Sequence, residues 1–440
     1  MSELLHLSVP ALAVGTYVGV PLYAWRRRGR AYAIFELIVL SIALPGTLFL
    51  HHRLAVLLPP AFVAGLDAGF AYGMATACAH MMALVRARLR PRPFRWLISR
   101  PGMAFIATGA LAGLWLLLLL PLRTALVLGG FERALMMLGW LDLVPLVVGA
   151  ASVFTSMRLP HEIVRFPLDG VPHPTITRLP TERHRRRAPA AARRPLRIVQ
   201  ITDPHLGPWQ PVHRLQRRLE RLVQHDPDLV LLTGDFLTLE SQNTPGALAA
   251  ALAPLARISD RCFATFGNHD HEAPDEVRHG LVANGIHLLL DDAIVTRTAV
   301  GEVQIVGADW VARDHAAHLA ALFARHPRRD GALRLLLMHS PIGFRHIPPG
   351  EVDLVLSGHF HGGQLGLVSM GFGWTVLSRT QWPDHGLFGQ GTNRLYVHRG
   401  TGFYGFPLRV GVPGEASVLE VLVDAAARNG GAPRPLGSRS

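Results

Sequence analysis

The stretch LRIVQITD, residues 196–203, is a short apolar run that ends in an aspartate. Four later stretches repeat this design of an apolar run with a polar end: DLVLLTGD (228–235), CFATFGNHD (262–270), LRLLLMHS (333–340) and VDLVLSGHFHGGQ (352–364). Short apolar runs that alternate with helical stretches are typical of buried strands in an α/β protein. Because the carboxyl ends of such strands meet at one edge of a sheet, we expect the polar residues to gather there.

The residues at these strand ends are of the kinds that bind divalent metals. They offer carboxylate, amide and imidazole ligands and no sulfur, which suits two ions such as manganese, iron or zinc without deciding among them. One carboxylate is suited to bridge two ions. The candidate ligands are Asp203, His205, Asp235, Asn268, His339, His359 and His361.

The order of these motifs resembles one enzyme family. The blocks D-x-H, GD, GNH-D, H and GH-x-H follow one another from Asp203 to His361, and residues 197–423 resemble the calcineurin-like metallophosphoesterases. The resemblance implies an α/β domain with the αββα sandwich fold and a dinuclear-metal phosphoesterase. It implies one ion held by Asp203, His205, Asp235 and His361, and a second held by Asp235, Asn268, His339 and His359.

The resemblance also assigns roles in catalysis. His269 matches the family's catalytic histidine, which stabilises or protonates the leaving oxygen, and we expect Asp270 to orient it. A metal-bridging hydroxide would attack phosphorus in line, since the cations lower the pKa of bound water.

The last motif resembles a particular branch of the family. GHFHGGQ, residues 358–364, is similar to the GH-x-HGGQ of membrane-associated phosphodiesterases, with Phe360 where threonine is usual. Some relatives of this kind hydrolyse the pyrophosphate of UDP-2,3-diacylglucosamine, whereas others carry several N-terminal spans and have no settled substrate. The Phe360 departure leaves the metal ligands intact, but the identity of the substrate does not carry over.

The N-terminal third is expected to be a helical membrane domain over residues 1–157. A span needs about 20 mostly apolar residues, and five stretches qualify: about 9–25, 31–50, 60–85, 103–120 and 134–155. The arginines are distributed unequally between the two sides of the membrane. Four lie in the loop between the first two spans and six in the loop between the third and fourth, whereas the loops on the opposite side contain three. Cytoplasmic loops carry such an excess, so we expect a multi-pass protein of the cytoplasmic (inner) membrane with a cytoplasmic catalytic domain.

Two acids interrupt the predicted spans. Asp67 and Asp142 are costly in a membrane and are either functional groups or charges that face a packed interior.

Two segments are expected to lack a core of their own. Residues 158–195 are rich in proline and arginine and predict a basic linker, and residues 425–440 predict a disordered tail. The catalytic domain would then span residues 196–424.

The charge of the chain does not by itself indicate a nucleic-acid partner. The net charge is +13, but all 44 basic residues are arginine and none is lysine, which points to compositional bias and membrane-flanking charge. The two cysteines, Cys78 and Cys262, lie in different segments and predict buried thiols.

Several residues near the motifs leave alternatives open. Arg399 and Arg409 would either grip a substrate phosphate or form salt bridges. The glycine-rich segment 365–394, with Trp374 and Trp382, would either form an active-site rim that meets an acyl chain or a packed loop.

Three functions are compatible with these features. The first is a hydrolase of a phosphodiester or pyrophosphate bond in a lipid or lipid-linked nucleotide. The second is a membrane sensor or transporter with a regulatory metal domain, and the third is a nuclease, which would bind DNA with a steep dependence on salt. The sequence does not indicate the oligomeric state.

Overall fold

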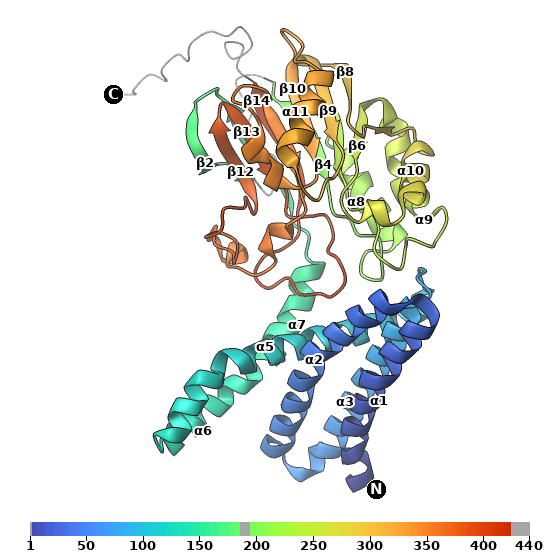
Figure 1. Ribbon diagram of the computed structural model, residues 1–440, viewed down its shortest axis with the longest axis vertical. Helices are drawn as coiled ribbons and strands as arrows, with labels where there is room; N and C mark the ends of the chain where they lie inside the picture. Colours follow the sequence, from blue (N-terminus) through green and yellow to red (C-terminus); the bar gives the residue numbers. More distant parts are fainter. Residues whose placement is uncertain (1, 185–193, 424–440) are drawn as a thin grey trace. The chain divides into compact units, whose positions relative to one another are not determined.

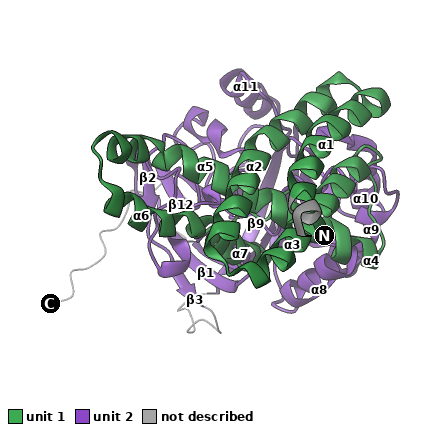
Figure 2. Ribbon diagram, turned by 90° about the horizontal axis from the view of Figure 1, so that it is seen from below, with its two compact units in different colours: residues 1–157, 405–410 green, residues 158–404, 411–440 purple. Residues whose placement is uncertain are grey.

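The computed structural model describes residues 2–184 and 194–423. The chain divides into two compact units (Figure 2). The helical unit comprises residues 1–157 and 405–410, and the catalytic unit comprises residues 158–404 and 411–440.

Among the described residues, the helical unit contains five stretches long and apolar enough to cross a membrane, in agreement with the five predicted spans. Its helices are α1 (Ser2–Arg28), α2 (Arg30–Leu57), α3 (Pro60–Leu84), α4 (Arg92–Phe94), α5 (Arg100–Leu128), α6 (Glu132–Trp140) and α7 (Val144–Met157) (Figure 1). A π-helical turn at Arg95–Ser99 joins α4 to α5, and a short 3-10 turn at Leu141–Leu143 joins α6 to α7.

Glycines allow α2 and α5 to pack backbone against backbone. A Cβ at Gly46 would lie 2.2 Å from the carbonyl oxygen of Gly109 and 2.2 Å from the amide nitrogen of Gly113. Small residues at such crossings are the usual basis of helix association in membranes, because they allow close van der Waals contact.

The two acids within the spans have partners. His51 Nε2 lies 2.7 Å from Asp67 Oδ1, with both side chains buried. Arg53 and Arg123 both pair with the buried Asp142. Of the two alternatives for these acids, the structure therefore supports paired charges in a packed interior.

The catalytic unit contains two seven-stranded sheets. The first has the order β3 (Glu182–His184), β1 (His161–Leu168), β14 (Ala416–Val423), β4 (Leu196–Ile201), β5 (Leu229–Thr233), β6 (Cys262–Thr265) and β7 (His287–Leu288). The second has the order β2 (His173–Leu179), β12 (Gly386–Gly391), β13 (Asn393–Val397), β11 (Leu354–Ser357), β10 (Leu333–Met338), β9 (Gly301–Ala308) and β8 (Asp292–Thr298).

The two sheets pack face to face, and helices lie beside them. One apolar core joins residues of both sheets, including Ile198 and Leu231 from the first and Leu335 and Leu356 from the second. The helices α8 (Val212–Val223), α9 (Ala247–Leu252) and α10 (Pro274–Val282) lie beside the first sheet, and α11 (His315–Arg325) packs on the second (Figure 1). This mixed α/β architecture confirms the predicted fold class.

The predicted linker over residues 158–195 differs from the structure. Its first part forms β1, which pairs with β14, and β3 and β2, which extend the two sheets. The arginines that suggested a solvated segment instead pair with carboxylates: Arg165 Nη2 lies 2.6 Å from Glu420, and Arg183 Nη1 lies 2.5 Å from Glu162. Residues 185–193 of the predicted linker and the predicted tail at 425–440 lie outside the described residues.

Candidate metal centre

Six of the seven polar residues predicted to gather at strand ends lie in two clusters, whereas the place of Asn268 stays a prediction. The backbone of several cluster members is unusual. Five of them are non-glycine residues with positive φ, a conformation that costs free energy outside glycine and is often found at functional sites. Their φ values are 50° at Asp203, 45° at His205, 58° at Asp235, 72° at His359 and 51° at His361. The turns that follow the strands thereby aim these side chains into one region.

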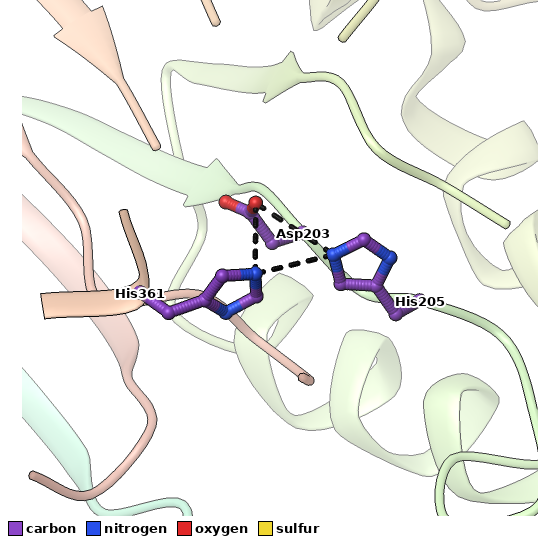
Figure 3. A group of neighbouring side chains, drawn as sticks. All are labelled: Asp203, His205 and His361. Atoms are coloured by element: carbon purple, nitrogen blue, oxygen red, sulfur yellow. Dashed lines mark hydrogen bonds and ion pairs between the residues drawn. The ribbon is translucent and has the colours of Figure 1, made fainter. Parts of the chain in front are cut away.

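One cluster joins the end of β4 to the turn after β11. Asp203, His205 and His361 point toward one another (Figure 3). His361 Nε2 lies 3.3 Å from Asp203 Oδ1 and 3.2 Å from His205 Nε2. All three residues are buried, and their ligand atoms lie within 4.8 Å of one another, a spacing that one metal ion can fill.

A second cluster joins the ends of β5, β10 and β11. Asp235, His339 and His359 bring ligand atoms within 4.8 Å of one another. His339 Nε2 lies 3.2 Å from Asp235 Oδ2, and His359 Nδ1 lies 3.3 Å from His339 Nε2.

Asp235 connects the two clusters. Its Oδ2 atom also lies 3.8 Å from His205 Nε2, which belongs to the first cluster. A carboxylate in this place can bridge two ions, which is the arrangement of two-metal phosphoryl chemistry.

The state of the polar atoms fits a pair of cations. Asp203 Oδ1 and Asn268 Oδ1 are buried and accept no hydrogen bond from any residue that the structure describes. A buried polar atom nearly always has a partner, so the orphaned oxygen of Asp203, a member of the first cluster, fits a bound cation. His205 Nδ1 and His339 Nδ1 face the carbonyl oxygens of Leu237 and Thr233 at 3.3 and 2.7 Å, which leaves their Nε2 atoms available.

The pKa values of the cluster residues also fit metal binding. Burial lowers the pKa of His205 to about 3 and that of His359 to about 4, so both imidazoles are neutral, as metal ligands must be. Burial raises the pKa of Asp203 to about 6, a cost that a bound cation would relieve. Burial lowers the pKa of His339, but the Asp235 carboxylate outweighs this and raises it to about 10, so an ion that binds here displaces a proton.

Asp270 does not do what the sequence suggested. We expected it to orient His269, but its buried carboxylate accepts hydrogen bonds from the backbone N–H groups of Asp235, Phe236 and Gly267. Asp270 thus holds the turn that presents Asp235. The side chain points back under that turn because three backbone donors converge there.

Glu272, and not Asp270, contacts the imidazole of His269. His269 Nδ1 lies 2.6 Å from Glu272 Oε1, and Gln242 Nε2 donates to Glu272 Oε2 at 2.5 Å. Sequence reasoning missed Glu272, although an acid three residues after a histidine in a turn is a signal that could have found it.

Tyr404 is a second residue that the motifs did not reveal. Its ring stacks on His269, with centroids 4.3 Å apart, and meets His205 edge-on at 5.2 Å. It lies far along the chain from both histidines, so only the fold brings them together.

The two arginines with open alternatives lie in different units. Arg399 is buried and pairs with Glu162 at 3.0 Å and with Glu415 at 3.6 Å, which supports the salt-bridge alternative. Arg409 lies in the helical unit, where its backbone N–H donates to Ser156 Oγ.

Comparison with known proteins gives a family match and several relatives. Residues 196–363 match the model of the calcineurin-like phosphoesterase family. The phosphodiesterase YaeI of Escherichia coli is 29% identical over 52% of this chain and 83% of its own length. The metallophosphoesterase YkoQ of Bacillus subtilis is 30% identical over 52% of this chain and 85% of its own length. A transmembrane protein with a metallophosphoesterase domain from Danio rerio is 30% identical over 49% of this chain and 50% of its own length.

Proposed function

The chain belongs to the calcineurin-like phosphoesterase family, and from that premise we propose that it hydrolyses a phosphodiester or pyrophosphate bond in a lipid or lipid-linked nucleotide. The observation that carries the proposal is the position of Asp235 between two clusters of ligand atoms. Its Oδ2 atom lies 3.2 Å from His339 Nε2 in one cluster and 3.8 Å from His205 Nε2 in the other.

In this proposal the seven strand-end residues hold two divalent ions. Asp203, His205 and His361 would hold the first ion, and Asp235, His339 and His359 the second. Asp235 would also contribute to the first ion and Asn268 to the second, as the family resemblance implies. When bound, such ions would supply a water of lowered pKa and positive charge against the phosphoryl oxygens.

His269 would transfer a proton to the leaving oxygen. Its Nδ1–H donates to Glu272, which leaves the Nε2 proton for the substrate. The stacked ring of Tyr404 limits rotation of the imidazole and covers one of its faces. General acid catalysis of this kind contributes about 10²–10⁴-fold to a rate.

A lipid substrate is favoured by the chain's own architecture. Five spans confine the enzyme to a membrane, and an enzyme and a lipid that share one surface meet far more often than in solution. The name of the E. coli relative gives its activity as a phosphodiesterase, and that of the Danio rerio relative joins a transmembrane protein to this domain.

The other two functions have less support. The acids within the spans are paired, Asp67 with His51 and Asp142 with Arg53 and Arg123, so they do not require transport. We expect no nucleic-acid partner, because described arginines such as Arg399 pair with carboxylates.

A soluble diester tests the chemistry. Purified full-length protein with added manganese should hydrolyse bis-p-nitrophenyl phosphate, and Asp235→Asn and His269→Ala should each abolish turnover. Undiminished activity in both variants would refute the mechanism. Incubation with a panel of lipids that includes UDP-diacylglucosamine, followed by mass spectrometry, then identifies the substrate.

We further propose that the catalytic unit is cytoplasmic, at the cytoplasmic (inner) membrane. The excess of arginine in the loops after the first and third spans supports this orientation. Alkaline phosphatase fused after Pro59 should be active, and fused after Arg90 it should be inactive. The reverse pattern would place the catalytic unit on the other side.

A further inference from the structure

Exposed apolar side chains gather on one segment of the catalytic unit. Among the described residues of this unit, ten large apolar side chains are exposed, and only three of them, Val171, Val282 and Val295, lie outside the range Leu365 to Trp382. We call residues 365–382 the apolar loop. Met370 and Phe372, at its tip, are 71% and 62% exposed. Exposed apolar side chains concentrated on one segment favour a surface that meets another apolar phase.

The apolar loop has a defined shape. Leu367 N–H donates to the carbonyl oxygen of Trp374 at 2.9 Å, and Gly366 pairs with Thr375 across the loop. Thr375 Oγ1 also donates to the buried carboxylate of Asp384, two residues after the end of the loop. The apolar side chains are therefore presented by a hydrogen-bonded turn.

The loop begins at the metal centre. Leu365 follows His361, a member of the first cluster, by four residues. Phe360, which stands where threonine is usual in the resembled motif, stacks on Trp382 with ring centroids 5.8 Å apart. The residue between the two ligand histidines of this turn thus packs on the end of the loop.

Hydrogen bonds also tie the loop to Gly411, within the catalytic unit. Leu365 pairs with Gly411, and Ser369 N–H donates to the carbonyl oxygen of Gly411 at 2.8 Å. Gly411 directly follows residues 405–410, which belong to the helical unit.

Within the helical unit, residues 405–410 are fixed to the last candidate span. Ser152 Oγ on α7 donates to the carbonyl oxygen of Pro407 at 2.7 Å, and the N–H of Arg409 donates to Ser156 Oγ at 3.0 Å.

The charge of the loop suits a lipid surface. Between Leu365 and Trp382 the sequence has one charged residue, Arg379, and no acid. Aromatic and aliphatic side chains with a cation at the edge are the composition of segments that enter the headgroup region of a bilayer.

We propose that the apolar loop enters the lipid surface of the membrane that the chain spans, and that it admits the phosphoester headgroup of a lipid to the metal centre. The occupant of this surface is the bilayer itself. The proposal rests on the proposed hydrolase function for its substrate, but the insertion of the loop can be measured without any turnover.

Depth-dependent quenching measures the insertion. Full-length protein with Cys78→Ser is labelled with a fluorophore at Phe372→Cys and reconstituted into vesicles that contain nitroxide-bearing phospholipids. The lipids should quench this fluorophore strongly. The matched control is a label at Val282→Cys, an exposed apolar position outside the loop, which should be quenched little. Equal quenching at both positions would overturn the proposal.

A ratio of rates links the loop to the substrate. The Phe372→Ser/Trp374→Ser variant should lower the ratio of lipid hydrolysis in vesicles to bis-p-nitrophenyl phosphate hydrolysis by about tenfold, because apolar area no longer enters the lipid. The Val282→Ser control should leave the ratio unchanged. A ratio equal to that of the control would contradict the proposed role of the loop. If the wild-type protein hydrolysed neither substrate, the proposed hydrolase function would be contradicted, but the proposed insertion of the loop would not.

Discussion

At the scale of single residues, the hydrogen bond between His269 and Glu272 determines how the histidine holds its proton. Burial by itself lowers the pKa of His269, but the hydrogen bond with Glu272 and the charges of Asp235 and Glu272 outweigh it and raise the pKa above its usual value. A general acid must be protonated before transfer, so a raised pKa keeps His269 competent at neutral pH.

Replacement of Glu272 tests this pair. In Glu272→Gln the pKa of His269 falls, so the alkaline limb of the pH–rate profile should move to lower pH, with a loss of roughly tenfold in turnover at pH 8. The profile is measured with bis-p-nitrophenyl phosphate. Glu220→Gln, on the exposed side of α8, is the control and should keep the wild-type profile. An unshifted alkaline limb in Glu272→Gln would remove Glu272 from the mechanism.

The sequence indicated which residue types gather at the site, but not every contact that they make. The motifs named the members of both clusters because metal ligands need particular atoms at strand ends. The partner of His269 was predicted wrongly, since Asp270 and Glu272 are both close in sequence and only the turn decides which one reaches the imidazole. Tyr404 is far from His269 in the sequence, so no local pattern predicts their contact.

At the scale of elements, apolar runs predicted β4, β5, β6, β10 and β11 because buried strands need little else. The same criterion failed for β1, β2 and β3, where arginine, proline and histidine interrupt the apolar residues. These strands are stabilised by ion pairs as well as by apolar burial: Glu162 lies 3.0 Å from Arg399 and 2.5 Å from Arg183.

The pairing of β1 with the core can be tested by a single change. Glu162→Gln removes the carboxylate that lies 3.0 Å from the buried Arg399 and leaves Glu415, at 3.6 Å, as a carboxylate partner. Loss of one partner of a buried pair costs about 3–5 kcal/mol, and we expect about 3 kcal/mol here because Glu415 remains. The midpoint of thermal unfolding of the full chain in detergent should fall accordingly. Glu182→Gln, whose side chain is 67% exposed, is the matched control. Equal midpoints in the two variants would show that the Glu162 ion pair of β1 does not stabilise the fold.

At the scale of the whole molecule, the membrane-spanning part was predictable because length and hydropathy are sufficient to identify spans. The packing of the spans was not, since it depends on where small residues from different helices meet. Gly46 on α2 faces Gly109 and Gly113 on α5, and no pattern within one helix reveals that match.

A valine at Gly46 tests this crossing. Its Cβ would overlap the α5 backbone at 2.2 Å, so the helices must separate at a cost of about 1–3 kcal/mol. Gly46→Val should shorten the half-life of the folded chain in mild detergent, as measured by limited proteolysis. Gly15→Val, where nothing lies within 4 Å of an added Cβ, should not. Similar half-lives for the two variants would contradict the proposed close packing.

The proposed chemistry requires two cations shared by one carboxylate, so the metal content of the purified full-length chain is its sharpest test. Mass spectrometry of protein prepared without chelator should find two equivalents of divalent metal per chain. We expect His361→Ala to retain about one equivalent and Asp235→Ala to retain none, because Asp235 alone contributes to both sites. Wild-type protein without bound divalent metal, or an Asp235→Ala variant that keeps both equivalents, would contradict the account.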